Sequence, residues 1–141
     1  MMLRTVLAIV VGVIGGGLVN MGLIMAGSSL IAAPAGMDVS DAQSVAAHAH
    51  LFEPRHFVFP FLAHALGTFA GALIAFLVAV QHRQVVAGVV GGVTLFGGIS
   101  AAFIVPAPIW FVVLDLLLAY VPMAWLATLI GARMVSKAGV N

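Results

Sequence analysis

The chain has 141 residues, of which 64% are hydrophobic and only 6% charged, and its formal net charge is +1. This composition excludes an ordinary water-soluble domain, in which about 25% of residues are charged, because so short a chain cannot bury that much apolar surface against itself. The absence of cysteine excludes disulfides, thiolate metal sites, iron–sulfur clusters and covalently attached c-type haem. The sequence has no basic run of the kind that binds nucleic acid. We therefore expect a single domain over residues 1–141 whose partner is the lipid bilayer.

Four apolar stretches are each long enough to cross a bilayer core, which takes about 20 helical residues. They predict transmembrane helices over about 5–33, 57–80, 85–105 and 109–131. The first stretch exceeds the apolar region of a signal peptide, about 7–15 residues, so we expect it to stay as a helix. Pro122 leaves the carbonyl of Leu118 without its helical partner and predicts a kink. The expected fold is an all-α membrane protein, a compact four-helix bundle.

Lysine and arginine predict the orientation of this bundle, because they gather in cytoplasmic loops. The side that carries the N-terminus holds Arg4, Arg83, Arg133 and Lys137, whereas the other side holds only Arg55. We therefore expect both termini in the cytoplasm and the loop 34–56 outside.

The loop 34–56 carries a helix-start pattern of its own. Ser40 followed by Gln43 is typical of a capping box, and residues 41–52 contain no glycine or proline. This pattern predicts a short interfacial helix at the outer surface, ending before Pro54.

Glycines spaced four apart occur in three of the predicted helices. Such pairs let two helix backbones approach closely in a membrane. They predict packing faces, although glycine is also common in membrane helices for no specific reason. The pairs are Gly12 with Gly16, Gly67 with Gly71, and Gly88 with Gly92.

Three polar side chains are expected at a similar depth, roughly 9–10 Å below the outer edge of the bilayer core. They are Asn20, His64 and Asp115. A carboxylate facing lipid costs about 2.5–3.5 kcal/mol, so Asp115 should face the interior and pair with His64. Asn20 and Thr68 are expected to complete the hydrogen bonds. The constellation either fixes helix register, or forms a protonatable or ligand-binding site open to the outer side, or separates into other pairings.

A metal site has weak candidates in the outer loop, namely His50, Glu53 and His56. Imidazole and carboxylate groups suit zinc or copper, but Pro54 interrupts the run, and we expect neither a metal nor a cofactor. Ser28, Ser29 and Ser100 have no nearby histidine–acid pattern. The sequence therefore favours a protein that is not an enzyme, without deciding the matter.

Several segments resemble a group of uncharacterised small bacterial four-helix integral membrane proteins. The similarity extends over nearly the whole chain. It implies a four-helix fold in the bacterial inner membrane and carries no assigned activity. The segments are Leu51-Phe52-Glu53-Pro54-Arg55-His56-Phe57, Phe59-Pro60-Phe61-Leu62-Ala63-His64-Ala65-Leu66-Gly67-Thr68, Pro106-Ala107-Pro108-Ile109-Trp110-Phe111 with Leu114-Asp115, and Tyr120-Val121-Pro122-Met123-Ala124-Trp125-Leu126.

Three functions remain open from the sequence. The first is an accessory or scaffold subunit that acts through helix–helix contacts, with itself as a homo-oligomer or with a larger membrane complex. The second is a small oligomeric transporter or channel that uses the His64–Asp115 pair to handle protons or a solute. The third is a membrane redox or lipid-binding subunit.

Overall fold

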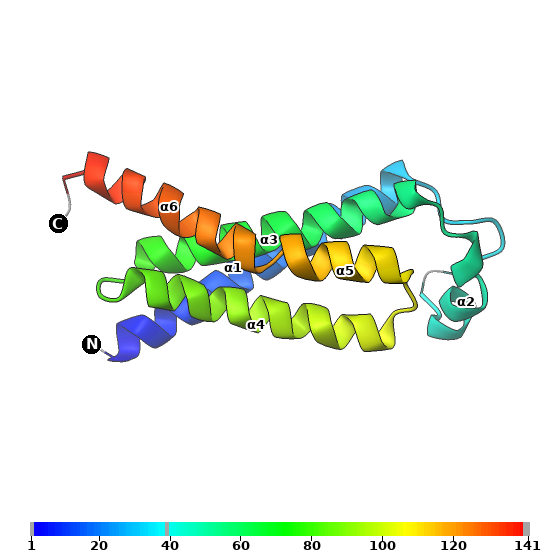
Figure 1. Ribbon diagram of the computed structural model, residues 1–141, viewed down its shortest axis with the longest axis horizontal. Coiled ribbons are helices and arrows are strands. Elements are labelled where there is room, and N and C mark those ends of the chain that lie inside the picture. Colours follow the sequence, from blue (N-terminus) through cyan, green and yellow to red (C-terminus); the bar gives the residue numbers. More distant parts are fainter. Residues whose placement is uncertain (1, 39, 140–141) are drawn as a thin grey trace.

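The computed structural model describes residues 2–38 and 40–139, and all regular structure within these ranges is helical (Figure 1). Three short elements, α2 (Ala42–Ala47) and the 3₁₀ helices η1 (Ala49–Leu51) and η2 (Pro54–Phe57), join the first two long helices. The long elements are α1 (Met2–Leu30), α3 (Val58–Val78), α4 (Arg83–Ile104), α5 (Ile109–Leu118) and α6 (Val121–Lys137).

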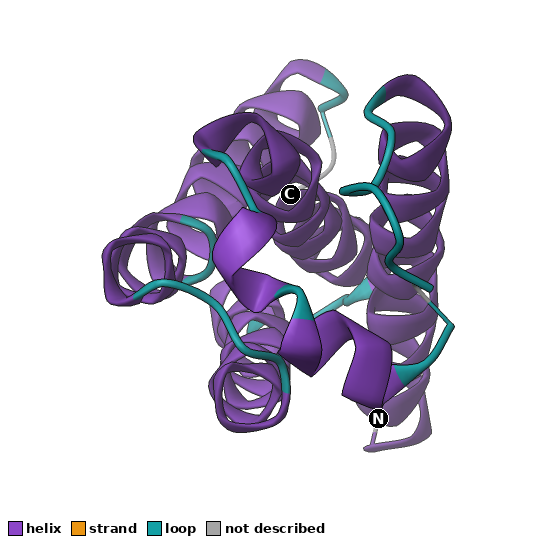
Figure 2. Ribbon diagram, turned by 90° about the vertical axis from the view of Figure 1, so that its right-hand side faces the viewer, coloured by secondary structure: helices purple, strands orange, loops and turns teal. Residues whose placement is uncertain are grey.

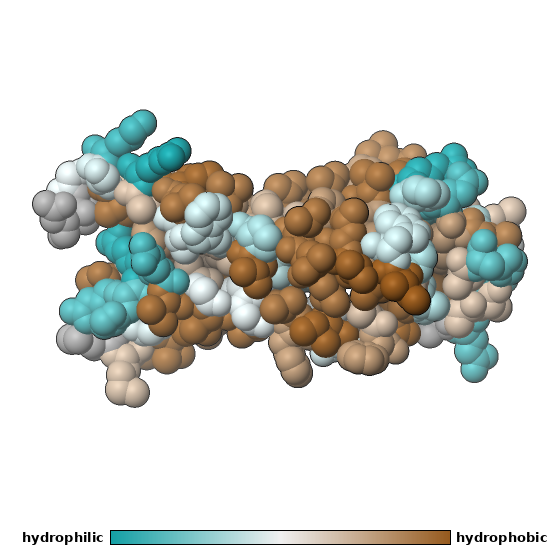
Figure 3. Space-filling model, viewed as in Figure 1, coloured by the Kyte–Doolittle hydropathy of each residue, from teal (hydrophilic) through white to brown (hydrophobic). Residues whose placement is uncertain are grey.

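Four helical segments of the described chain are long and apolar enough to cross a membrane. They are Met2–Leu30, Pro54–Val78, Arg83–Ile104 and Ile109–Lys137. The space-filling view shows a broad apolar band around the middle of the molecule, with hydrophilic residues gathered toward both ends (Figure 3). The prediction of an all-helical chain with four candidate spans is confirmed.

The ends of two spans differ from the prediction. The first helix runs from Met2 to Leu30 instead of over 5–33, and the last continues to Lys137 instead of ending near residue 131. The hydroxyls of Ser28 and Ser29 both donate to the carbonyl of Met25 (2.8 and 3.0 Å), and such bonds compete with the helical ladder in the last turn. The last helix continues past residue 131 because a helix satisfies its own backbone hydrogen bonds in water as well as in lipid. It therefore extends into the polar residues up to Lys137.

Different segments of the chain lie at the two ends of the bundle. The start of α1, the end of α6 and the α3–α4 connection lie at one end, here called the terminal end (Figure 1). The three short helices and the α4–α5 connection lie at the other, here called the loop end. Figure 2 looks down the bundle from the loop end and shows the short helices lying across the ends of the long ones.

The first of these short helices begins one residue later than predicted. The carboxylate of Asp41, not the hydroxyl of Ser40, accepts the backbone N–H groups of Gln43 and Ser44, both at 3.1 Å. The Ser40 hydroxyl instead donates to Asp38 at 2.6 Å, and together with the Ser40 backbone N–H it holds the pKa of Asp38 below its ordinary value. The predicted helix over 41–52 is divided, since α2 ends at Ala47 and η1 follows.

Helices α1 and α3 touch through their backbones. A Cβ atom added to Gly12 would lie 2.7 Å from the carbonyl oxygen of Gly71, and one added to Gly16 would lie 2.6 Å from that of Gly67. Any side chain larger than hydrogen would therefore push the two helices apart. The structure thus brings the first two glycine pairs of the sequence against each other.

The third glycine pair does not lie in such a contact. Gly88 and Gly92 are exposed, and an added Cβ at either would meet no atom within 4 Å. The neighbouring Gly91 faces inward instead, against Ala124 of α6. Helix α4 is oriented by its larger apolar residues, because Val86 and Val90 are almost fully buried, and this orientation turns Gly88 and Gly92 away from the bundle.

The half of the bundle nearer the terminal end is filled with small side chains. Two clusters of buried residues lie there, one between α1, α3 and α4 and the other between α3, α4 and α6. Alanine dominates both, and Phe76 is the one large side chain. The clusters are Ala8, Ala75, Ala79, Val86 and Val90, and Ala72, Phe76, Ala87, Ala124 and Ala127.

The fourth span is broken where the sequence predicted a kink. Helix α5 ends at Leu118, α6 begins at Val121, and Pro122 stands in the first turn of α6. Because proline has no N–H to donate, the carbonyl of Leu118 loses its helical partner. The break sets the position of Tyr120 relative to the end of α5.

Gly16→Leu is expected to lower the free energy of unfolding by about 1–3 kcal/mol or more, the typical cost of overpacking, because its side chain would meet the α3 backbone. The measurement is reversible unfolding in mixed micelles. Gly22→Leu is the matched control on α1, since a Cβ there meets nothing within 4 Å. Equal stability of the two variants would contradict the backbone contact.

Candidate functional site

A hydrogen bond joins two helices inside the bundle. His64 lies on α3 and Asp115 in the last turn of α5, and the imidazole Nδ1 is 2.8 Å from Oδ2 of the carboxylate. The side chain of Asp115 is 7% exposed and that of His64 is 24% exposed. The structure therefore places together the two residues that the sequence suggested as partners, with the carboxylate the deeper of the two.

Tyr120 is a third member of this group. Its hydroxyl donates to the same Oδ2 of Asp115 at 3.1 Å, and its ring stacks on the imidazole of His64 with centroids 5.8 Å apart. Gly98 of α4 makes room for the tyrosine, because an added Cβ at Gly98 would collide with the hydroxyl group. Sequence reasoning missed this role, although the helix break predicted by Pro122 was a signal for it, since Tyr120 lies beside that break and five residues after Asp115.

The hydrogen bonds define which imidazole nitrogen is free. The carboxylate of Asp115 can only accept, so Nδ1 of His64 must carry the proton that it donates. In the neutral ring, Nε2 then has no proton and is a hydrogen-bond acceptor. Within the described residues His64 has no hydrogen bond at Nε2. The other carboxylate oxygen of Asp115, Oδ1, is buried and also lacks a hydrogen-bond partner there. A buried polar atom without a partner is uncommon in native proteins and calls for an explanation.

Thr68 and Asn20 do not complete the hydrogen bonds of the pair. The Thr68 hydroxyl donates to Thr94 of α4 at 3.2 Å. Asn20 is half-buried and packs against the backbone of Gly67, and no hydrogen bond joins it to His64 in the described chain. Thr68 lies one turn further along α3 than His64, where its nearest polar neighbour is on α4.

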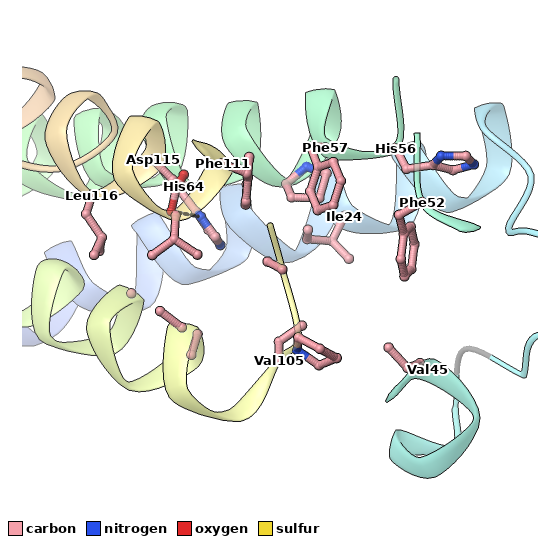
Figure 4. A pocket seen from close by; sticks show the side chains of 17 residues that line it. Ile24, Val45, Phe52, His56, Phe57, His64, Val105, Phe111, Asp115 and Leu116 are labelled. Atoms are coloured by element: carbon pink, nitrogen blue, oxygen red, sulfur yellow. Dashed lines mark hydrogen bonds and ion pairs between the residues drawn. The ribbon is translucent and has the colours of Figure 1, made fainter. Parts of the chain in front are cut away.

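A cavity of about 270 Å³ extends from the pair toward the loop end. Figure 4 shows His64 and Asp115 together at one end of this loop-end cavity, with Phe52 and His56 at the other. Apart from His56, His64 and Asp115, its lining is apolar. The walls come from α1, α2, η2, α3, α4 and α5, and include Ile24, Phe57, Ala102, Val105, Phe111 and Leu116.

A second cavity of about 290 Å³ lies on the other side of His64, between α1 and α4. It contains the remaining polar residues of the predicted constellation, Asn20 and Thr68, and the ring of Tyr120 also borders it. This side cavity and the loop-end cavity share His64, Gly98 and Ala101. The imidazole therefore borders both spaces.

The weak metal candidates of the loop are engaged in local structure. The backbone N–H of Glu53 donates to Nδ1 of His56 at 2.9 Å, as part of a capping box that starts η2. The Glu53 carboxylate pairs with Arg55 at 3.0 Å, and His50 is exposed. Within the described residues, histidine and acidic side chains form no group of three or more that could hold a metal ion.

The arrangement combines an apolar space with the His64–Asp115 pair at one end and His56 at the other (Figure 4). The carboxylate of Asp115 fixes the imidazole by its Nδ1–H, and the opposite nitrogen can accept a proton or a hydrogen bond from a molecule in either cavity. No known protein family, curated protein or solved structure matches the chain.

His64→Ala and Asp115→Ala are each expected to destabilise the protein by about 1–3 kcal/mol, because each leaves a partly or fully buried partner without its hydrogen bond. The double variant should lose less than the sum by at least about 0.5 kcal/mol, as coupled residues do. Unfolding in mixed micelles measures this cycle, and His64→Ala with Asp41→Asn is the uncoupled control. Strictly additive losses at residues 64 and 115 would contradict the pairing.

Proposed function

We propose that this protein is a membrane-embedded binding protein, not an enzyme, for a small lipid-soluble molecule with one hydrogen-bonding head group. The observation that carries this proposal is the free nitrogen of His64 at one end of an apolar cavity. Ligand sites in proteins are commonly apolar spaces with a few placed polar groups that orient the bound molecule. Asp115 supplies the orientation here, since it holds the imidazole in one tautomer.

The volume of the cavity and the charge of Asp115 limit which molecules could bind. A cavity of about 150 Å³ holds benzene, so a cavity of about 270 Å³ suits a molecule of roughly a dozen heavy atoms. A ligand carboxylate would be repelled by Asp115, and a cation would compete with His64 for that carboxylate. An uncharged hydroxyl head fits best, because it can donate its proton to Nε2 of His64.

The proposal includes a location in the bacterial inner membrane with both termini in the cytoplasm. Arg4, Arg83, Arg133 and Lys137 all belong to the terminal end, which supports the positive-inside assignment. The loop-end cavity then lies in the outer half of the bilayer. In this orientation α2 and η1 lie at the outer surface of the membrane.

Packing favours binding over conduction. A channel or proton path through a single chain would need to continue from His64 to the terminal end. The residues on that route, Ala8, Ala75 and Val90, have no exposed surface and pack against one another. A transporter that uses the pair would therefore need a rearrangement or an oligomeric pathway, whereas a binding protein needs neither.

Binding of 2-naphthol and of naphthalene to the protein in nanodiscs tests the proposal. The two probes have nearly the same size, and only naphthol can hydrogen bond to His64. After correction for partition into empty nanodiscs, naphthol should bind about tenfold more tightly, which corresponds to one hydrogen bond of about 1.4 kcal/mol.

Ala102→Phe supplies the matched loss-of-binding variant, because residue 102 borders only the loop-end cavity and a phenyl ring there would fill it. Ala132→Phe on the exposed surface of α6 is its control. Equal affinity for both probes, or naphthol binding that survives Ala102→Phe, would overturn the proposal.

An accessory subunit that acts through helix contacts is the second candidate function. It is favoured by the outward-facing Gly88 and Gly92, where a partner helix has open space to approach the α4 backbone. Native mass spectrometry from nanodiscs should then show an oligomer that Gly92→Leu dissociates. A monomer for both the parent and the variant would exclude self-association through this face.

A further inference from the structure

Helices α1 and α4 are in contact near the terminal end and separate toward the loop end. At the contact, a Cβ added to Gly12 would lie 3.2 Å from a methyl group of Val90. Further along both helices, the side cavity occupies the space between them. The two helices therefore form a cleft that is closed at its base.

Glycines form the rims of this cleft. Gly17 on α1 and Gly97 on α4 both border the side cavity and are exposed. An added Cβ at either position would meet no atom within 4 Å. The absence of side chains at these two positions, rather than a loose fold, keeps the cleft open toward the apolar surface of the bundle.

The cleft leads to the polar end of the site. His64 is 24% exposed and borders both the side cavity and the loop-end cavity. A molecule that passes between Gly17 and Gly97 would meet the imidazole first and could then place its apolar part in the loop-end cavity. Gly98 and Ala101, which also border both cavities, are small enough to leave this passage open.

Aromatic rings gather at the loop end, where a further space of about 440 Å³ shares Ile24, Phe52, His56 and Pro60 with the loop-end cavity. Phe57 is 9% exposed, and its ring lies 4.6 Å from that of Phe111, 5.5 Å from Trp110 and 5.7 Å from Phe52, centroid to centroid. Val45 of α2 lies further out on the same side of the cavity (Figure 4). A ligand that entered from water would pass this aromatic cluster, and Phe52 borders both spaces on that route.

We infer that the ligand enters sideways from the lipid, through the window between Gly17 and Gly97, so that its chemical class is an uncharged amphiphile dissolved in the bilayer. This inference rests on the proposed function and adds the route and the phase from which the ligand comes. The head group reaches His64 at the depth where the cleft opens, and the apolar part never leaves an apolar environment. The side cavity is the entry passage and the loop-end cavity is the binding site.

Stopped-flow association of 2-naphthol with the protein in nanodiscs tests the window. The combined variant Gly17→Leu with Gly97→Leu should slow association and dissociation by roughly tenfold, which corresponds to about 1.4 kcal/mol in barrier height, while the affinity stays nearly the same. Gly22→Leu, an exposed position on α1 with no atom within 4 Å of an added Cβ and outside both cavities, should behave as the parent.

Phe52→Ala distinguishes the two routes, because it removes a ring from the aromatic cluster at the loop end. Association that is unchanged in the window variant but faster in Phe52→Ala would overturn lateral entry and leave the binding site intact. Unchanged rates in both variants would also overturn it. No saturable naphthol binding by the parent protein would overturn the binding function itself, and with it this inference.

Discussion

The buried carboxylate of Asp115 is the group on which the rest of the bundle depends. An acidic side chain in an apolar interior is stable only with hydrogen-bond partners or an opposite charge. Here the partners come from two directions, the imidazole of α3 and the hydroxyl of Tyr120 beyond the end of α5. These two bonds tie α3, α5 and α6 together at one depth. The other oxygen, Oδ1, is buried and has no hydrogen-bond partner among the described residues.

Glycine serves two opposite purposes in this small bundle. On the face that α1 presents to α3, Gly12 and Gly16 remove side chains so that two backbones touch. At Gly17 the same helix again lacks a side chain, but no neighbour approaches and space remains. The close contact with α3 holds α1 in place near the loop end without support from α4. The space between α1 and α4 can therefore stay open there.

Composition and residue spacing predicted an all-helical chain with four candidate membrane spans. The expected depth of His64 and Asp115 in the bilayer predicted that these two residues pair. Long apolar runs are typical of membrane helices, and His64 was the best partner expected at the depth of Asp115. Tyr120 was missed because a regular helix would turn it away from Asp115, and only the break at Pro122 brings it back. The outward direction of Gly88 and Gly92 was not predictable either, since it follows from which face of α4 buries Val86 and Val90. Cavities depend on distances between helices, and these distances are not encoded by any local pattern.

The break between α5 and α6 also has an electrostatic consequence. A helix carries about half a negative charge at its C-terminal end and half a positive charge at its N-terminal end, and Asp115 lies in the last turn of α5. The N-terminal end of α6 at Val121 offsets the end of α5, so the carboxylate of Asp115 itself makes the local potential negative. Such a field favours a molecule that brings a proton toward the imidazole over one that brings only lone pairs. An alcohol or phenol would therefore be preferred over a ketone or quinone of the same shape.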